Sequence, residues 1–391
     1  MPGTNQQLSN SANHQATSNN SREIRLVKNI ATLMLLLLSA RLMAQDAPDE
    51  TPVDKFTVHG YLTQAFAKTD GEQILGIPGD GTTDYRRAAV LFRFTPTPKD
   101  GLVVQIAQRR MGNSPSMAFE PSVKLDWAFY ERKLAQGASL RVGRIPQPMG
   151  LLNETRYVGT LLPFYRAPYN FYQEGSFTSE TVDGLALRYS TSSARSWSGE
   201  GSVYGGGTSM VEQSQNGLVQ PRAEKMLGGQ FWLNTPVTGL RFGVGAQRFD
   251  LTGTVLNAAG KDSWKSYYVS GEYAGSRVKL SSEYRKTKIH EADINFESYY
   301  VYAGVDATSR LGLHAQFDTS RIDVAVGPGR LDVPKYYEDK TLGATFAFRP
   351  DVVLKGEYHW SESQLLETHP LPIGAPSRPV NYGILSLSVS F

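Results

Sequence analysis

The chain ends on the stretch YGILSLSVSF (residues 382–391), in which apolar and polar residues alternate with a period of two. Successive side chains of a β-strand point to opposite faces, so this alternation predicts a strand with one apolar and one polar face. The apolar face holds Gly383, Leu385, Leu387, Val389 and Phe391, and three serines alternate with its last members. The terminal segment therefore favours a half-buried sheet and an all-β fold.

The same alternation recurs through most of the chain. It is found in residues 352–360, 342–348, 311–317, 278–284, 123–129, 102–106, 88–94 and 56–66. A soluble β-sandwich or periplasmic β-protein is an alternative, because alternation alone does not say which face is wet. A water-filled lumen explains more directly why lysine and glutamate recur at alternate positions through so many strands.

The connections between these segments alternate in length. Seven are tight turns, at residues 95–101, 135–138, 190–196, 234–239, 274–276, 306–310 and 349–351. Eight are longer polar stretches, around residues 68–84, 111–121, 145–183, 205–224, 249–263, 286–295, 319–335 and 361–379. Fifteen connections imply about 16 strands. Short turns on one rim and long loops on the other are typical of a transmembrane, antiparallel, up-and-down β-barrel. A barrel of that size is too wide for side chains to fill.

Composition excludes several other classes. The 391 residues carry 40 Lys and Arg against 37 Asp and Glu, without a run of five like charges, so a nucleic-acid partner is not indicated. A mean hydropathy of −0.33 excludes a bundle of membrane helices. The chain has no cysteine, which excludes disulfide scaffolds, thiolate metal sites and cysteine nucleophiles.

The N-terminus reads as a targeting region. Residues 1–21 are polar and predict a disordered extension, and residues 22–44 combine basic residues, a short apolar run and a small residue at the end. This predicts a signal peptide cleaved after Ala44; a membrane anchor would need about 20 apolar residues. Residues 45–55 would form a short periplasmic segment before a barrel over residues 56–391. The signal region holds Arg22, Arg25, Lys28 and Arg41 against Glu23, so its net +3 leaves a mature chain with 36 basic and 36 acidic groups.

The longest connection, residues 145–183, is the third long loop and predicts a pore constriction. Opposed charges across a narrow pore sort solutes by charge. The loop and its ends supply Arg144, Arg156, Arg166, Glu154, Glu174, Glu180 and Asp183, and the preceding strands supply Arg87, Arg93, Arg109, Arg132 and Arg141. The aromatic residues Tyr157, Phe164, Tyr165, Tyr169, Phe171 and Tyr172 are expected to pack the loop against the wall, rather than to form a stacking track for sugars.

Strand register gives the charges that face the lumen. The basic ones are Arg87, Arg93, Arg109, Lys124, Arg132, Arg141, Arg241, Lys279, Arg285 and Lys355. The acidic ones are Asp126, Glu272, Glu283, Asp306, Asp318 and Glu357. Ten inward basic residues against six acidic ones favour a weak preference for anions. A register shift of one residue in a strand would move that strand's charges to the other face.

Over essentially its whole mature length the sequence resembles the Gram-negative outer-membrane porins. The resemblance rests on the Phe-terminated last strand and on RVGRIPQPMGLLNETR (residues 141–156), which is similar to the porin strand leading into a long third loop. It implies passive diffusion of small hydrophilic solutes, a homotrimer, contact with outer-membrane lipid and lipopolysaccharide, and a third loop folded inward. It also implies a signal for the barrel-assembly machinery, assigned to Tyr382, Leu385, Leu387, Val389 and Phe391. The phosphate-selective porins are a more distant candidate, since no lysine cluster or arginine ladder matches theirs.

Barrel enzymes and other functions have less support. His359-Trp360-Ser361 continues as Glu362-Ser363, not as the His-x-Ser-Asn-Gly of a barrel phospholipase, and no two histidines have metal-ligand spacing. Residues 45–55 are too few for a plug domain. We therefore expect no enzyme, no cofactor and no metal, and a non-conducting structural or adhesive barrel is the main alternative to a porin.

Overall fold

The computed structural model describes residues 55–118, 123–135, 137–174, 180–191, 197–214, 217–254, 260–372 and 374–391. The proposed extension and signal peptide, residues 1–44, lie outside the described residues, as do residues 45–54. Within the described residues, no helix is both long and apolar enough to cross a membrane.

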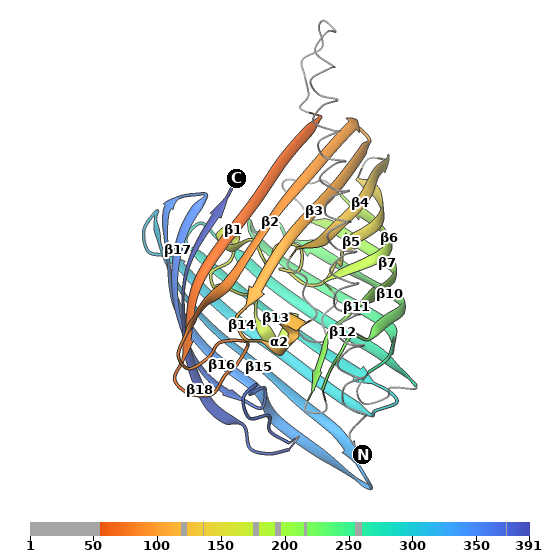
Figure 1. The fold of residues 1–391 in the computed structure, drawn as a ribbon. Coiled ribbons are helices and arrows are strands. Elements are labelled where there is room, and N and C mark those ends of the chain that lie inside the picture. Colours follow the sequence, from red (N-terminus) through yellow and green to blue (C-terminus); the bar gives the residue numbers. More distant parts are fainter. Residues whose placement is uncertain are drawn as a thin grey trace, which may run out of the picture. The chain divides into compact units, whose positions relative to one another are not determined.

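Sixteen antiparallel strands form a closed barrel, in which each strand pairs with its neighbours along the chain and β1 pairs with β18 (Figure 1). The barrel strands are β1 (Phe56–Thr69), β2 (Thr82–Thr97), β3 (Asp100–Met111), β4 (Lys124–Ala135), β5 (Ala138–Pro146), β6 (Thr181–Ser190), β7 (Ser198–Ser209), β10 (Arg222–Asn234), β11 (Leu240–Thr252), β12 (Lys261–Ala274), β13 (Val278–Ile289), β14 (Ile294–Asp306), β15 (Leu311–Val326), β16 (Gly329–Arg349), β17 (Val352–Ser363) and β18 (Arg378–Ser390). A separate hairpin joins β8 (Glu212–Ser214) to β9 (Gly217–Val219), and the short helices are η1 (Pro115–Ala118), η2 (Gly159–Leu161) and α2 (Tyr169–Tyr172). The all-β, up-and-down barrel predicted from the alternation is confirmed.

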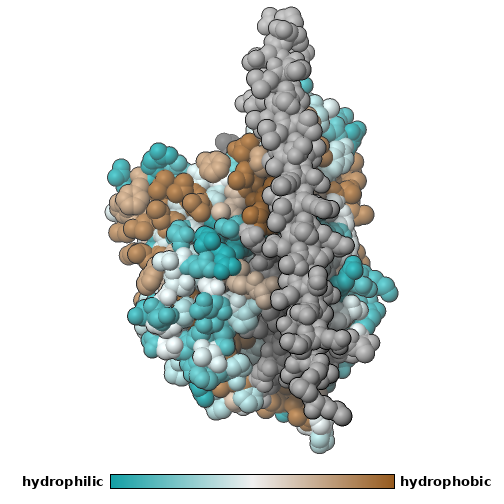
Figure 2. Space-filling model, in the orientation of Figure 1, coloured by the Kyte–Doolittle hydropathy of each residue, from teal (hydrophilic) through white to brown (hydrophobic). Residues whose placement is uncertain are grey.

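Alternation separates an outer apolar face from an inner polar face. On β1, Leu62 and Phe66 are 48% and 46% exposed, whereas Thr63 between them is buried. On β18, Leu385 and Leu387 point outward and Ser386 and Ser388 point inward. Figure 2 shows hydrophobic residues gathered over the upper part of the visible face, with mainly hydrophilic residues below. Closure of the barrel lets the backbone groups of β1 and β18 form hydrogen bonds with each other. Backbone groups in lipid need such partners because no water is there to bind them.

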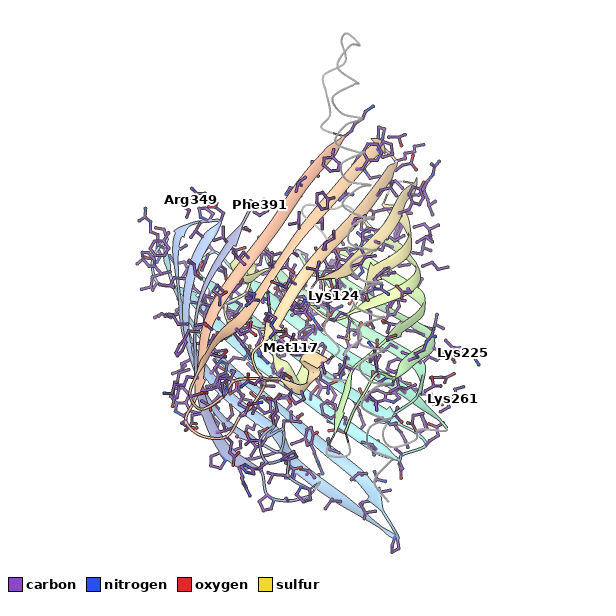
Figure 3. All side chains as sticks on the ribbon, in the orientation of Figure 1. Met117, Lys124, Lys225, Lys261, Arg349 and Phe391 are labelled. Carbon is purple, nitrogen blue, oxygen red and sulfur yellow. The ribbon has the colours of Figure 1, made fainter. Side chains whose placement is uncertain are left out.

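The two rims differ in the length of their connections, with two exceptions described in the next paragraph. We call the rim with the short connections the turn end and the opposite rim the loop end; Arg349 and Phe391 lie together at the turn end, and Lys225 and Lys261 lie toward the loop end (Figure 3). The pairing of β1 with β18, which closes the barrel, ends at the turn end. There Gly60 and Phe391 exchange two backbone hydrogen bonds of 2.9 Å. The Phe391 ring lies over Gly60, since a Cβ added there would be 2.4 Å from its Cζ.

Two of the eight predicted long loops are instead short turns between extended strands. Residues 290–293 alone join β13 to β14, and residues 327–328 alone join β15 to β16. The predicted stretches were polar, but their charges pair across strands: Arg321 bonds Asp332 at 2.6 Å and Arg330 bonds Asp323 at 2.7 Å. Such cross-strand pairs stabilise strands that carry polar side chains.

Tyr382 also departs from the expected terminal signal. It is buried on the inner face, where its hydroxyl bonds that of Tyr337 at 3.0 Å and its ring stacks on His359. It therefore does not share the outward face with Leu385, Leu387 and Phe391.

Candidate pore constriction

The described part of the third loop between β5 and β6, residues 147–174, lies inside the barrel. Helix α2 of this loop lies against β13 and β14 in Figure 1. On another side, η2 approaches the wall so closely that a Cβ on Gly159 would lie 2.2 Å from Thr63 Oγ1 and 2.3 Å from Ser388 Oγ. Only a glycine fits here, because any side chain would displace the loop from β1 and β18.

Charged side chains of the wall hold the main chain of this loop. Three cations donate to loop carbonyls: Lys355 to Phe164 (3.0 Å), Arg87 to Tyr165 (2.6 Å) and Arg285 to Phe171 (2.8 Å). Three carboxylates accept loop N–H groups: Glu283 from Leu151 (3.0 Å), Glu357 from Tyr165 (2.8 Å) and Asp318 from Asn170 (3.1 Å). We call these six residues the wall anchors. They come from β2, β13, β15 and β17, so the loop is fixed from several sides of the barrel.

Ion pairs add to this attachment on the side of β2 and β3. Arg87 pairs with Glu174 of the loop. Arg109 binds both oxygens of Asp126 on β4 at 2.8 Å and Glu180 of the loop at 2.6 Å. Glu180 also receives Arg156 at 2.8 Å. All these guanidiniums are nearly fully buried, and the cost of desolvating them is offset only because each has a carboxylate partner.

Aromatic rings complete the contact, as the sequence predicted. Arg109 lies 3.6 Å from the ring centre of Tyr157, and Arg87 lies 4.3 Å from that of Tyr165. Phe171 contacts Tyr268 and Tyr300 of the wall edge-on. Such contacts between guanidiniums and ring faces are strongest where water is excluded.

Folding lowers the pKa values of Glu174 and Glu180 in the loop. Burial acts to raise the pKa of Glu174, but the guanidiniums of Arg87, Arg166 and Arg156 outweigh burial and lower it. Burial likewise acts to raise the pKa of Glu180, and Arg109 and Arg156 hold that pKa well below its usual range. A carboxyl whose pKa is lowered by folding stabilises the fold above its unfolded pKa, and this stabilisation is lost as the pH falls through the folded value.

We therefore expect the ion pairs of Glu174 and Glu180 to persist as the pH falls to about 4.3, the usual value for glutamate. These two ion pairs should cause no change in single-channel conductance between neutral pH and about pH 5, and should be lost only in stronger acid. The double variant Glu174→Gln/Glu180→Gln should already behave at neutral pH as the unaltered chain does in strong acid. A step in conductance near neutral pH would show that other groups control the loop.

Six predicted constriction residues meet at this site: Arg87, Arg109, Arg156, Arg166, Glu174 and Glu180. Arg166 bonds the hydroxyl of Tyr85. Arg93 and Arg141 instead share Glu131 nearer the turn end, at 3.2 and 2.8 Å. Glu154 faces Arg188 of β6 at 3.7 Å.

Arg132, Arg144 and Asp183 lie on the outer face, so placing Arg132 and Asp183 in the pore was wrong. A β-bulge in β4, where Asp126 is the extra residue opposite Gln105 and Ile106, turns Phe129 inward and Arg132 outward. Arg132 there binds Asp100 at 2.7 Å. Asp183 pairs with Arg144 at 2.7 Å, on the face that also carries Leu185. A bulge adds one residue to one strand and reverses every side chain beyond it.

The register also changes the charge of the lumen. It removes Arg132 from the ten inward basic residues and adds Lys133, Arg188 and Arg378. It adds Glu131, Glu200, Asp262 and Asp339 to the six acidic ones. The described strands then carry 12 inward basic and 10 inward acidic residues, so the excess of basic residues falls from four to two.

The sequence did not identify the other wall anchors as loop contacts. Alternation placed Glu283, Arg285, Asp318, Lys355 and Glu357 on the inner face, but nothing in their own strands indicates a partner more than 100 residues away. The only local signal is that charges of both signs occupy successive inward positions, as in Glu283 and Arg285.

Comparisons with known proteins identify the fold. No family model and no curated protein matches the chain. Among solved structures, OmpF of Salmonella typhi matches with a TM-score of 0.56 at 14% identity, over 86% of this chain and 97% of that one. The outer-membrane channel DcaP of Acinetobacter baumannii matches with a TM-score of 0.57 at 9% identity over the same shares. The anion-selective porin of Comamonas acidovorans matches with a TM-score of 0.54 at 11% identity, over 86% of this chain and 99% of that one. The closed barrel and these matches show that the chain has the fold of the outer-membrane porins.

Proposed function

We propose that this chain forms a water-filled channel for the passive diffusion of small hydrophilic solutes across the outer membrane. The observation that carries the proposal is a 16-strand barrel with an apolar outside and charged side chains of both signs inside. A barrel of this size leaves an aqueous interior unless it is plugged. The predicted homotrimer, the contacts with lipopolysaccharide and the use of the assembly machinery belong to the same proposal.

The charges of the lumen support weak selectivity. With an excess of two basic residues, and with pairs such as Arg241–Glu272 at 2.6 Å and Lys279–Asp306 at 3.1 Å, the inner face has little net field. We therefore expect at most a slight preference for anions.

A serine-hydrolase function has no support in the geometry near His359. The Ser361 hydroxyl donates to Asp339 Oδ1 at 2.5 Å, and His359 Nδ1 lies 2.7 Å from Asp339 Oδ2. Serine and histidine thus bind the same carboxylate, so the imidazole is not placed to take the serine proton. These residues form part of the polar inner wall.

The test is conductance of the refolded full mature chain in planar bilayers. We expect stepwise current increments in KCl, and liposomes containing the protein should swell in small sugars but not in large oligosaccharides. Bilayers that stay silent, while protease protection shows that the protein is inserted, would contradict the proposal and favour a structural or adhesive barrel.

A further inference from the structure

The ion pairs between the third loop and the wall differ sharply in exposure. The side chains of Arg87 and Glu174 are 2% and 8% exposed, and those of Arg109 and Glu180 are 4% and 20% exposed. The side chains of Arg188 and Glu154 are 36% and 38% exposed. Among the described residues, this last pair is the ion pair between loop and wall in which both charges remain accessible to water.

The surroundings of Arg188 leave its charge available. It lies on the inner face of β6, opposite Ser139 on β5 and Ser202 on β7. Its neighbours along that face are Ala186 and Ser190. None of these four side chains is charged. Glu131 on β4 interacts electrostatically with Arg188 but accepts its hydrogen bonds from Arg93 and Arg141, and the 3.7 Å from Arg188 to Glu154 exceeds a hydrogen-bond distance. A passing ion can therefore interact with the guanidinium without first breaking a tight bond.

The position of Glu154 is fixed by its neighbours in the loop. Leu151 donates its N–H to the wall anchor Glu283, and Arg156 is held by Glu180 and by the carbonyl of Tyr172. The main chain on both sides of Glu154 is thus held in place, and this holds the position of its half-exposed carboxylate. The buried arginines, by contrast, are occupied in holding the loop.

We propose that Arg188 and Glu154 are the charge pair that a permeating ion meets at the third loop, and that they set the ion selectivity of the channel. The proposal rests on the channel function proposed above. It moves the basic member of the selectivity pair from the buried arginines of β2 and β3 to Arg188 on β6, which is not among the predicted constriction residues.

The test is the reversal potential under a KCl gradient. Arg188→Glu places two carboxylates together and should change the chloride-to-potassium permeability ratio toward potassium by about two- to fivefold, the range expected for exposed charge pairs. Glu154→Lys should change the ratio toward chloride by a similar factor. The exchange Arg188→Glu/Glu154→Arg should restore the ratio of the unaltered channel, which a general disturbance of folding would not do.

Arg144 offers a matched control, because it lies close to the same loop but on the outer face. Arg188→Gln should shift the reversal potential, and Arg144→Gln should leave it unchanged. Conducting Arg188→Glu and Glu154→Lys channels with unchanged reversal potentials would overturn the inference and leave the channel function intact. An unaltered protein that inserts but does not conduct would overturn both.

Discussion

Changing Arg87, Arg285 and Lys355 together to glutamine should raise the single-channel conductance several-fold and make the open current noisy. These cations hold the carbonyls of the third loop at Phe164, Tyr165 and Phe171. A buried hydrogen bond to a charged group is worth about 1.5–3 kcal/mol, so the three together contribute roughly 5–9 kcal/mol to docking of the loop. Their loss should let the loop leave the wall for part of the time.

The matched control changes three inward cations that bind other barrel strands instead of the loop. Arg93, Arg241 and Lys279 pair with Glu131, Glu272 and Asp306. Their change to glutamine removes the same charge and should leave the single-channel conductance unchanged. Equal conductance in the two triple variants, with both barrels shown to be folded by heat-modifiable migration, would refute the anchoring role.

A crosslink provides a further check on the released loop. Thr160 Oγ1 lies 3.1 Å from Ser390 Oγ, and the chain has no cysteine of its own. Thr160→Cys/Ser390→Cys should form a disulfide in the anchored protein with little effect on current. In the triple anchor variant the same disulfide should reduce the excess noise.

Deleting Phe391 should strongly reduce the amount of barrel in the outer membrane while leaving refolding in detergent nearly intact. The deletion removes the two backbone bonds to Gly60, each worth about 1 kcal/mol, which is a small part of the stability of a closed barrel. A large loss in cells together with a small loss in vitro would indicate recognition of the terminal residue by the assembly machinery. The measurement compares heat-modifiable protein in outer-membrane fractions and in detergent.

Two variants separate recognition from packing. Phe391→Tyr keeps a terminal aromatic ring and should assemble almost normally. Gly60→Ala keeps Phe391 but places a Cβ where its ring lies, and should cost seam stability in detergent. Unchanged outer-membrane levels after deletion would exclude an assembly signal at this residue.

Alternation and connection length were sufficient to predict the barrel, because a strand with one face in lipid and one in water must alternate. Alternation gave the wrong face where one extra residue in a strand shifts its register. The bulge beside Gln105 has no marker in the sequence, and it reverses Arg132. The charges around residues 319–335 looked like loop residues, because cross-strand pairs such as Arg321–Asp332 exist only once the strands meet.

The site was only partly predictable for a similar reason. The sequence identified the third loop and its charges, and the structure brings Arg87, Arg109, Glu174 and Glu180 together. The sequence alone could not show that these four side chains are buried, or that Glu283 and Lys355 contact the loop. Such contacts depend on how the loop crosses a lumen enclosed by 16 strands.

The wall anchors end on main-chain atoms of the loop, and this has a consequence for how such a channel can change. A carbonyl or an N–H is present whatever side chain a residue carries, so these six bonds do not themselves depend on the identity of the loop residues. Exposed loop positions such as Leu161 can therefore accumulate substitutions while the loop keeps its path across the barrel. For an engineer, it is a fixed template on which new side chains can be presented to a passing solute without redesigning the scaffold.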